Sequence, residues 1–150
     1  MENDLAKAEL GVIAYALHKM ETKQHFIKNP KWNKLKVVIS SDLESASFFA
    51  ENHENKQFVS KIKKVVSKIV SVDSDLGNYA QNIYEKAKVK QASLAYSYGL
   101  SVSQSAELTG ADKKELQSYI GFTKMIDEET EAKTLSTRVK ELHELVGELG

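Results

Sequence analysis

A single proline in 150 residues constrains this chain more than any other feature. Proline interrupts helices and central strands, so a chain nearly free of it can form long regular elements. Apolar residues recur at intervals of three and four along most of the sequence, which is typical of amphipathic helices. The one proline, Pro30, follows Asn29 and predicts a loop between two helical stretches. We therefore expect an all-α fold, a helical bundle.

Four apolar stripes predict four helices before residue 100. We expect the first helix to run from Asn3 or Asp4 to about Phe26. The second follows the proline, although its β-branched run at residues 37–39 leaves a short strand there as an alternative. The polar segment 51–55 predicts a connection to the third helix. The stripes are Leu5, Ala8, Val12, Ala16 and Met20; Trp32, Leu35, Ile39, Leu43, Ala46 and Ala50; Phe58, Ile62, Val65, Val66 and Ile69; and Tyr79, Ile83, Ala87, Leu94 and Tyr98.

The composition fits a compact protein inside the cell. Hydrophobic residues make up 41% of the chain, enough to bury a core for one domain or two small ones. Cysteine is absent, which excludes disulfides and thiolate metal sites and favours a reducing compartment. No apolar run is long enough for a signal peptide or a membrane span. We expect a cytoplasmic protein with no membrane contact and no cofactor.

Charge is segregated along the chain although the formal net charge is zero. A zero net charge disfavours a protein that coats nucleic acid by bulk charge alone. Acids gather near the C-terminus, so the molecule has basic patches and an acidic end. Arg138 is the one arginine, so contacts to nucleic acid should depend on lysine and phosphate rather than on arginine and guanine. The basic stretches hold Lys19, Lys23, Lys28, Lys31, Lys34 and Lys36; Lys56, Lys61, Lys63, Lys64 and Lys68; and Lys86, Lys88 and Lys90.

Residues 103–120 form the most specific local pattern of the chain and resemble the helix-turn-helix of DNA-binding regulators. Two helices that cross steeply need a small residue where their backbones approach, and Ala106 fits that position. They also need a turn that tolerates a positive φ, and Gly110 fits there. Asp112 can cap the second helix, with Glu115 three residues later as in a capping box.

The second helix of this unit should face its neighbours through Leu116 and Ile120, and the preceding helix, about residues 78–98, should complete a tri-helical core. Its outward positions are then free to contact DNA. Lysines there can reach phosphates or guanine, and a glutamine amide can pair with adenine. A helical hairpin that serves only packing or protein contact is the alternative. The predicted nucleic-acid-binding residues are Lys113, Lys114, Gln117 and Ser118.

The stretch from Gly110 to Glu129, with Tyr119-Ile120-Gly121-Phe122-Thr123 at its centre, is also similar to archaeal regulators encoded beside PIN-type ribonucleases. Those regulators act as antitoxins. The similarity covers 20 of the 150 residues and implies a PIN-type toxin as protein partner, with DNA as a second ligand. It does not extend to residues 1–75, whose role the sequence leaves open.

The C-terminal part combines an acidic stretch with an apolar seam. The acids from Asp127 to Glu131 predict a linker, and an amphipathic helix follows it. The domain organisation expected is an N-terminal helical region, residues 1–75, a helix-turn-helix unit, residues 76–126, and the acidic linker with its helix, residues 127–150. The apolar seam of this helix could pair with a second copy in a homodimer. Because two heptads are few for a coiled coil, packing of the helix on its own domain is an equal alternative. Its seam, in alternating steps of four and three, is Leu135, Val139, Leu142, Val146 and Leu149.

Metal sites find little support in the sequence. His18, Glu21 and His25 share one side of a helix, but seven residues place the two histidines about 10 Å apart, too far for one ion. Helix caps and turns explain two acidic pairs more simply than a metal does. These pairs are Asp42 with Glu44 and Asp73 with Asp75. We expect no metal ligands.

One enzymatic alternative remains. Arg138 and His143, with four residues between them, resemble the Arg-x4-6-His motif of HEPN ribonucleases, which are all-α and pair these residues across a dimer interface to cleave RNA. The family often has a polar residue where this chain has Val139. A further alternative is that Phe26 and Trp32, within the lysine-rich stretch, stack on RNA bases.

The sequence favours a DNA-binding transcriptional regulator with no catalytic residue, and the similarity to antitoxins offers one form that such a regulator takes. Its expected partners are DNA, a toxin or other protein, and a second copy of the chain. The alternatives are the HEPN-like ribonuclease and a protein-interaction module without nucleic acid.

Overall fold

The structure, a computed structural model, describes residues 2–76 and 82–148. Those residues form seven helices and no strand, so the expected all-α fold is confirmed. The run 37–39, for which a strand was the alternative, is helical. In these same ranges no helix combines the length and the apolar character needed to cross a membrane. The helices are α1 (Glu2–Glu21), α2 (Gln24–Ile27), α3 (Pro30–Glu51), α4 (Asn55–Leu76), α5 (Ile83–Ser97), α6 (Val102–Thr109) and α7 (Lys113–Glu148).

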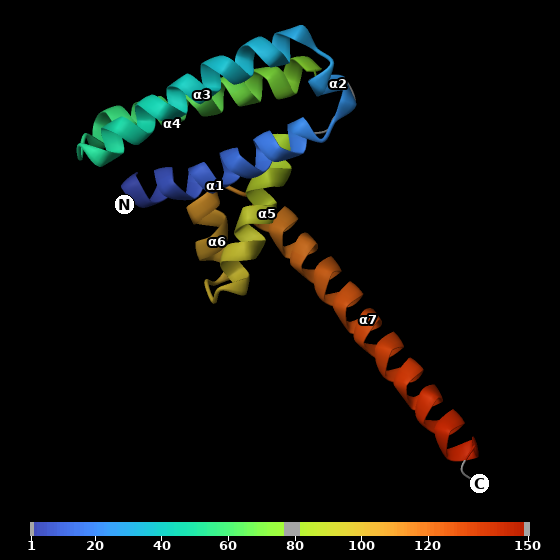
Figure 1. The fold of residues 1–150 in the computed structure, drawn as a ribbon. Coiled ribbons are helices and arrows are strands. Elements are labelled where there is room, and N and C mark those ends of the chain that lie inside the picture. The colour runs from blue at the N-terminus through green and yellow to red at the C-terminus, as the bar shows by residue number, and fades with distance from the viewer. Residues whose placement is uncertain (1, 77–81, 149–150) are drawn as a thin grey trace.

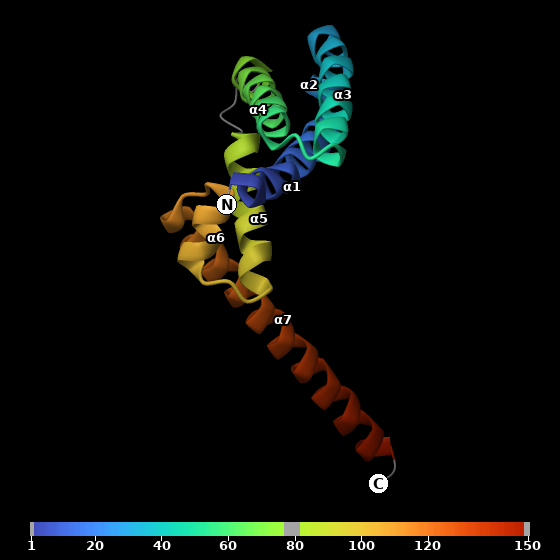
Figure 2. The ribbon, with the colours of Figure 1, turned by 90° about the vertical axis from the view of Figure 1, so that its left-hand side faces the viewer.

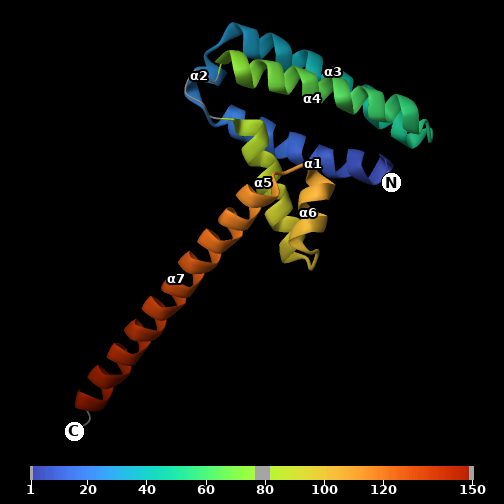
Figure 3. The same ribbon diagram turned by 180° about the vertical axis from the view of Figure 1, so that it is seen from behind.

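The helices form a body of six with one long helix leaving it (Figure 1). α3 and α4 lie antiparallel, and α1 lies beside α4. α5 and α6 pack on the other side of α1, as the perpendicular view in Figure 2 shows. α7 begins next to α5 and α6 and then extends away from them as a rod, which is also clear from behind (Figure 3).

The large core lies between α1, the α3–α4 hairpin and the start of α5. Its end near the proline loop is closed by Phe26 and Trp32, whose rings meet edge to face with centroids 5.6 Å apart. The indole Nε1 of Trp32 donates to the carboxylate of Glu21 at 2.7 Å, which satisfies its one polar atom. Both rings are fully buried, so the alternative in which they stack on RNA bases is wrong. The buried stripe residues include Val12, Ala16, Met20, Ile39, Ala46, Phe58, Ile62, Val65 and Ile69.

A smaller core lies within α5, α6 and the start of α7, and α5 contributes to both cores. Ile83, Tyr84 and Ala87 belong to the large core, whereas Val89 and Ala92 belong to the small one. Because the two cores meet inside one helix, burial alone does not mark a domain boundary at residue 76. The division of the chain there stays a prediction. The small core consists of Val89, Ala92, Ala106, Ala111, Leu116 and Ile120.

The start of α5 is held by two acids from other helices. Asp73 on α4 accepts a hydrogen bond from the backbone amide of Tyr84 at 3.0 Å, so it caps α5 from across the fold. The Tyr84 hydroxyl donates to Glu9 of α1 at 2.9 Å. Burial, with Glu9 beside it, raises the pKa of Tyr84. Asp75, the other member of that acidic pair, bonds to Lys31 at 2.7 Å.

Three sequence expectations, two about helix limits and one about burial, need correction. The first helix ends at Glu21, and Phe26 lies in the separate short helix α2. The acidic stretch 127–131 is not a linker, because α7 runs through it without a break. Ala50, assigned to the buried stripe of the second helix, is exposed, as are Leu5, Leu94 and Tyr98. Tyr79 lies outside the described residues.

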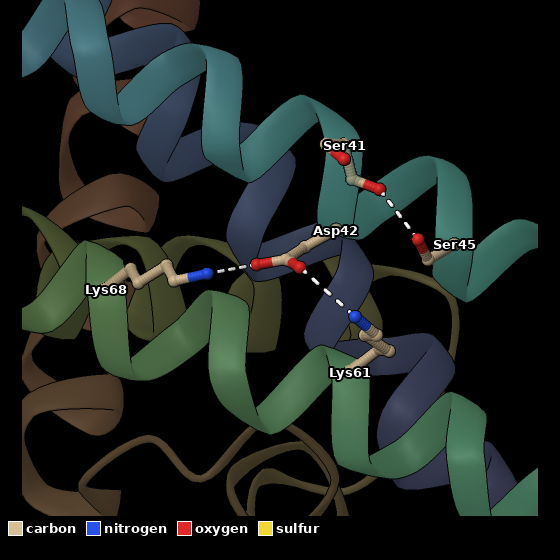
Figure 4. Close-up of polar contacts among 5 residues, drawn as sticks. All are labelled: Ser41, Asp42, Ser45, Lys61 and Lys68. Carbon is tan, nitrogen blue, oxygen red and sulfur yellow. Dashed lines mark hydrogen bonds and ion pairs between the residues drawn. The ribbon is translucent and has the colours of Figure 1, made fainter.

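Asp42 joins the two long helices of the hairpin (Figure 4). Its carboxylate, on α3, accepts hydrogen bonds from Lys68 and, at 3.3 Å, from Lys61, both on α4. The Asp42 side chain is only 14% exposed, so water screens these contacts little. The bond from Lys68, and secondarily Lys61, hold the pKa of the Asp42 carboxyl below its usual value, against the opposing effect of burial.

We predict that Asp42→Asn lowers the free energy of unfolding by about 1 kcal/mol near neutral pH, because two charged hydrogen bonds are weakened. A carboxyl with a depressed pKa stabilises the fold above its unfolded pKa and loses that contribution as the pH falls through its folded pKa. The difference between the two proteins in urea unfolding should therefore vanish in acid. Glu44→Gln, at an exposed position on the same helix, is the control. A difference that persists at low pH would contradict the assignment.

Candidate nucleic-acid interface

The bend expected at Gly110 is present and joins α6 to α7. Gly110 has a φ of 74° in the left-handed region, and its amide donates to the carbonyl of Ala106 at 2.8 Å, which ends α6. Ala106 is buried in the small core, as expected for the crossing point. Asp112 caps α7, because its side chain accepts from the amide of Glu115 at 2.9 Å.

The start of α6 carries a capping device that the sequence analysis did not identify. Ser101 Oγ accepts from the amide of Gln104 at 3.1 Å, and Gln104 Oε1 accepts from the amide of Ser101 at 3.0 Å. This is a complete capping box, and it fixes where the eight-residue helix begins. The signal was visible as serine followed three residues later by glutamine.

The first turns of α7 have the two faces that the sequence predicts. Leu116 is fully buried and Ile120 nearly so, both in the small core with α5 and α6. The side chains on the outward face lie exposed on the surface, close to the N-terminus of the helix, where orphan amides favour anions. This exposed set is Lys113, Lys114, Gln117 and Ser118.

A groove of about 770 Å³ runs beside this face, between α7, α5 and the C-terminal half of α1. Lys114 and Ser118 line it, whereas Lys113 and Gln117 do not. It is strongly basic, since it gathers five lysines with one acid, Glu115, in a protein whose net charge is zero. The lysines are Lys19, Lys23, Lys86, Lys90 and Lys114, and the aromatic lining is Tyr15, Tyr119 and Phe122.

Tyrosines orient two of the groove lysines. Lys90 Nζ donates to the Tyr119 hydroxyl at 2.9 Å, and this bond raises the pKa of Lys90 despite the opposing effect of burial. Lys19 Nζ lies 5.6 Å from the ring centroid of Tyr15, within cation–π range. The Lys90 amine is therefore held in its charged form, and the groove presents positive charge to an anion.

The other candidate sites do not assemble. In the part of the chain that the structure describes, no three histidine or acidic side chains lie close enough to hold a metal ion. Arg138 and His143 are both exposed on α7. Five positions on a helix separate side chains by about 7.5 Å along the axis and about 140° around it, so within one chain these two point apart.

No protein-family model, curated protein sequence or solved structure matches this chain.

Paired glycine substitutions test the turn. Gly110→Ala should lower the free energy of unfolding by roughly 1–2 kcal/mol, because alanine is strained at a positive φ. The strain is conformational, since a Cβ there meets its nearest neighbour, the Lys88 side chain, at 4.0 Å. Gly121→Ala is the control. Gly121 lies inside α7, and a Cβ added there meets nothing within 4 Å, so this change should raise the free energy of unfolding by up to about 1 kcal/mol. Equal effects of the two in urea denaturation would contradict a left-handed turn at Gly110.

Proposed function

We propose that this protein binds duplex DNA through the α5–α6–α7 unit and acts as a transcriptional regulator. The observation that carries the proposal is the gathering of five lysines, from α1, the turn that follows it, α5 and α7, beside the exposed N-terminal face of α7. Charge concentrated in this way, against a net charge of zero, is the electrostatic footprint of a phosphate-binding surface.

The proposed contacts divide into two classes. The first turns of α7 enter the major groove, where Gln117 contacts adenine and Lys113 contacts a phosphate or guanine. The sugar-phosphate strand that borders the major groove then lies in the basic groove, against Lys19, Lys23 and Lys114. A concave groove of 770 Å³ suits one strand better than a whole duplex. Phosphate contacts fix the position of the protein, and contacts to base edges select the sequence.

A cytoplasmic, antitoxin-like regulator remains part of this proposal. The similarity of residues 110–129 to archaeal antitoxins supports it, and a PIN-type toxin is then the protein partner. The HEPN-like ribonuclease stays the enzymatic alternative, because that motif acts across two copies of a chain, and the divergence of Arg138 and His143 on one α7 does not bear on it.

Salt dependence of binding tests the proposal. If about six phosphates are contacted, affinity for a duplex should fall on the order of 10³-fold between about 50 and 200 mM salt. The double variant Lys113→Ala, Lys114→Ala should weaken binding about 10- to 100-fold and reduce the slope of log affinity against log salt by about two. The measurement is fluorescence anisotropy with labelled duplex and single-stranded DNA.

A second double variant, Lys19→Ala with Lys23→Ala, tests the groove itself. These lysines lie far from α7 in sequence, so an equal loss of slope would tie α1 to the same DNA site. Lys133→Ala with Lys140→Ala removes the same charge from exposed positions farther along α7 and should leave the slope unchanged. Gln117→Ala should lower the preference for a selected sequence without changing the slope. If all three lysine pairs behave alike, or if no duplex binds at low salt, the protein-interaction alternative replaces this proposal.

A further inference from the structure

The distal part of α7 exposes an apolar seam that no other described part of the chain covers. The buried contacts of α7 end near Ile120, and beyond it the helix leaves the body (Figure 2). Leu135, Val139, Leu142 and Val146 are each more than half exposed. The salt bridge between Lys133 and Glu129 at 3.3 Å, and the hydrogen bonds of threonine hydroxyls to backbone carbonyls, add little stability to this part of the helix. A helix segment of this kind is marginal alone in water.

The residue types in this seam specify how it pairs. In heptad notation the first apolar position, a, is occupied by Ala132, Val139 and Val146, and the second, d, by Leu135 and Leu142. β-Branched residues at a with leucine at d favour two parallel strands. In a parallel pair the flanking positions oppose Glu131 to Ser136 and Arg138 to His143 of the second copy, so no acid opposes an acid and no lysine or arginine opposes another.

The same spacing continues upstream toward the proposed DNA face, but most of the residues at these positions are no longer apolar. Steps of three and four lead from Ala132 back through Glu128, Met125, Gly121 and Ser118 to Lys114. Such a stripe drifts only about 20° per heptad on a straight helix, so it stays on one half of α7. In a pair of helices, the Glu128 carboxylates of the two copies would repel each other, and so would the two Lys114 amines farther upstream. The paired part of the seam therefore begins at about residue 132, and the two helices diverge on the N-terminal side of that residue.

We propose that α7 pairs with α7 of a second copy as a parallel two-stranded coiled coil over residues 132–148, which forks upstream and holds two helix-turn-helix units toward one duplex. The pairing stands on the exposed seam alone, whereas the fork rests on the proposed DNA binding. The two-fold axis then runs along the coiled coil, and the two units contact half-sites about one DNA turn apart, roughly 34 Å.

Sedimentation equilibrium tests the pairing without DNA. The unaltered protein should be a dimer at about 100 μM, because a seam of about two heptads holds two copies only weakly. Val139→Asp with Leu142→Asp should raise the dissociation constant at least 100-fold. Thr134→Asp with Thr137→Asp, exposed positions outside the seam, adds the same charge and should leave the dimer intact. Circular dichroism checks that the body remains folded in both variants. A monomer at 100 μM, or a trimer, would overturn the proposal and leave the seam for another protein.

Orientation has its own test, because the chain contains no cysteine. Val146→Cys should form an intermolecular disulfide quickly on oxidation, since equivalent positions face each other in a parallel pair. Thr137→Cys, on the outer side of the helix, should not. In an antiparallel pairing of residues 132–148 the two introduced thiols would lie about 20 Å apart, so failure of Val146→Cys to crosslink would rule out the parallel arrangement.

DNA binding by the seam variant separates this inference from the proposed function. Val139→Asp with Leu142→Asp should lose at least tenfold in affinity for a two-half-site duplex and keep its affinity for a single half-site, because only the linkage of two sites is lost. Equal affinity for the two duplexes in the unaltered dimer would overturn the fork and leave the pairing. A dimer that binds neither duplex would end the proposed function and the fork together, again without touching the pairing.

Discussion

The arrangement of the described part of the molecule depends on α5, which contributes buried residues to two different cores. Its first residues, Ile83 and Tyr84, complete the large core, and Ala92 completes the small one. Asp73 on α4 and Glu9 on α1 fix the start of this helix through hydrogen bonds to Tyr84, so its direction is tied to the large core. A rigid helix shared by two cores transmits that direction, so α6 and the start of α7 keep a defined position relative to α1.

This constraint explains why the basic groove forms. Lys19 and Lys23 flank the end of α1, where Met20 is its last buried residue, and α5 packs on α1 there, so lysines distant in sequence become neighbours. Like charges brought together repel, and folding must supply the free energy to hold them. The bond from Lys90 to Tyr119 and the contact of Lys19 with Tyr15 offset part of that repulsion. A surface that keeps such a cluster is better explained by a polyanionic ligand than by stability.

The local features of the candidate site could be predicted from sequence, but its tertiary features could not. Gly110, Asp112 and Leu116 act through short-range geometry, namely a positive φ, a cap and helical spacing, and all three behave as expected. The lysine-rich stretches predicted basic patches, but periodicity within a helix does not say which helices will face each other. Trp32 shows the same limit, since an aromatic ring among lysines suggests a stacking surface until packing buries it.

The continuity of α7 changes what the helix-turn-helix can do mechanically. The acids at 127–131 suggested a flexible connection, yet acidic side chains are compatible with a helix interior, and no proline or capping signal interrupts this one. A rigid helix couples the orientation of Lys114 to that of Val146, whereas a linker would leave each unit free to rotate. Rigid coupling lowers the entropy lost when two units bind one duplex, and it also fixes the half-site spacing that can be bound. In the proposed DNA-bound dimer, the uninterrupted helix would allow operators to be distinguished by spacing as well as by base contacts.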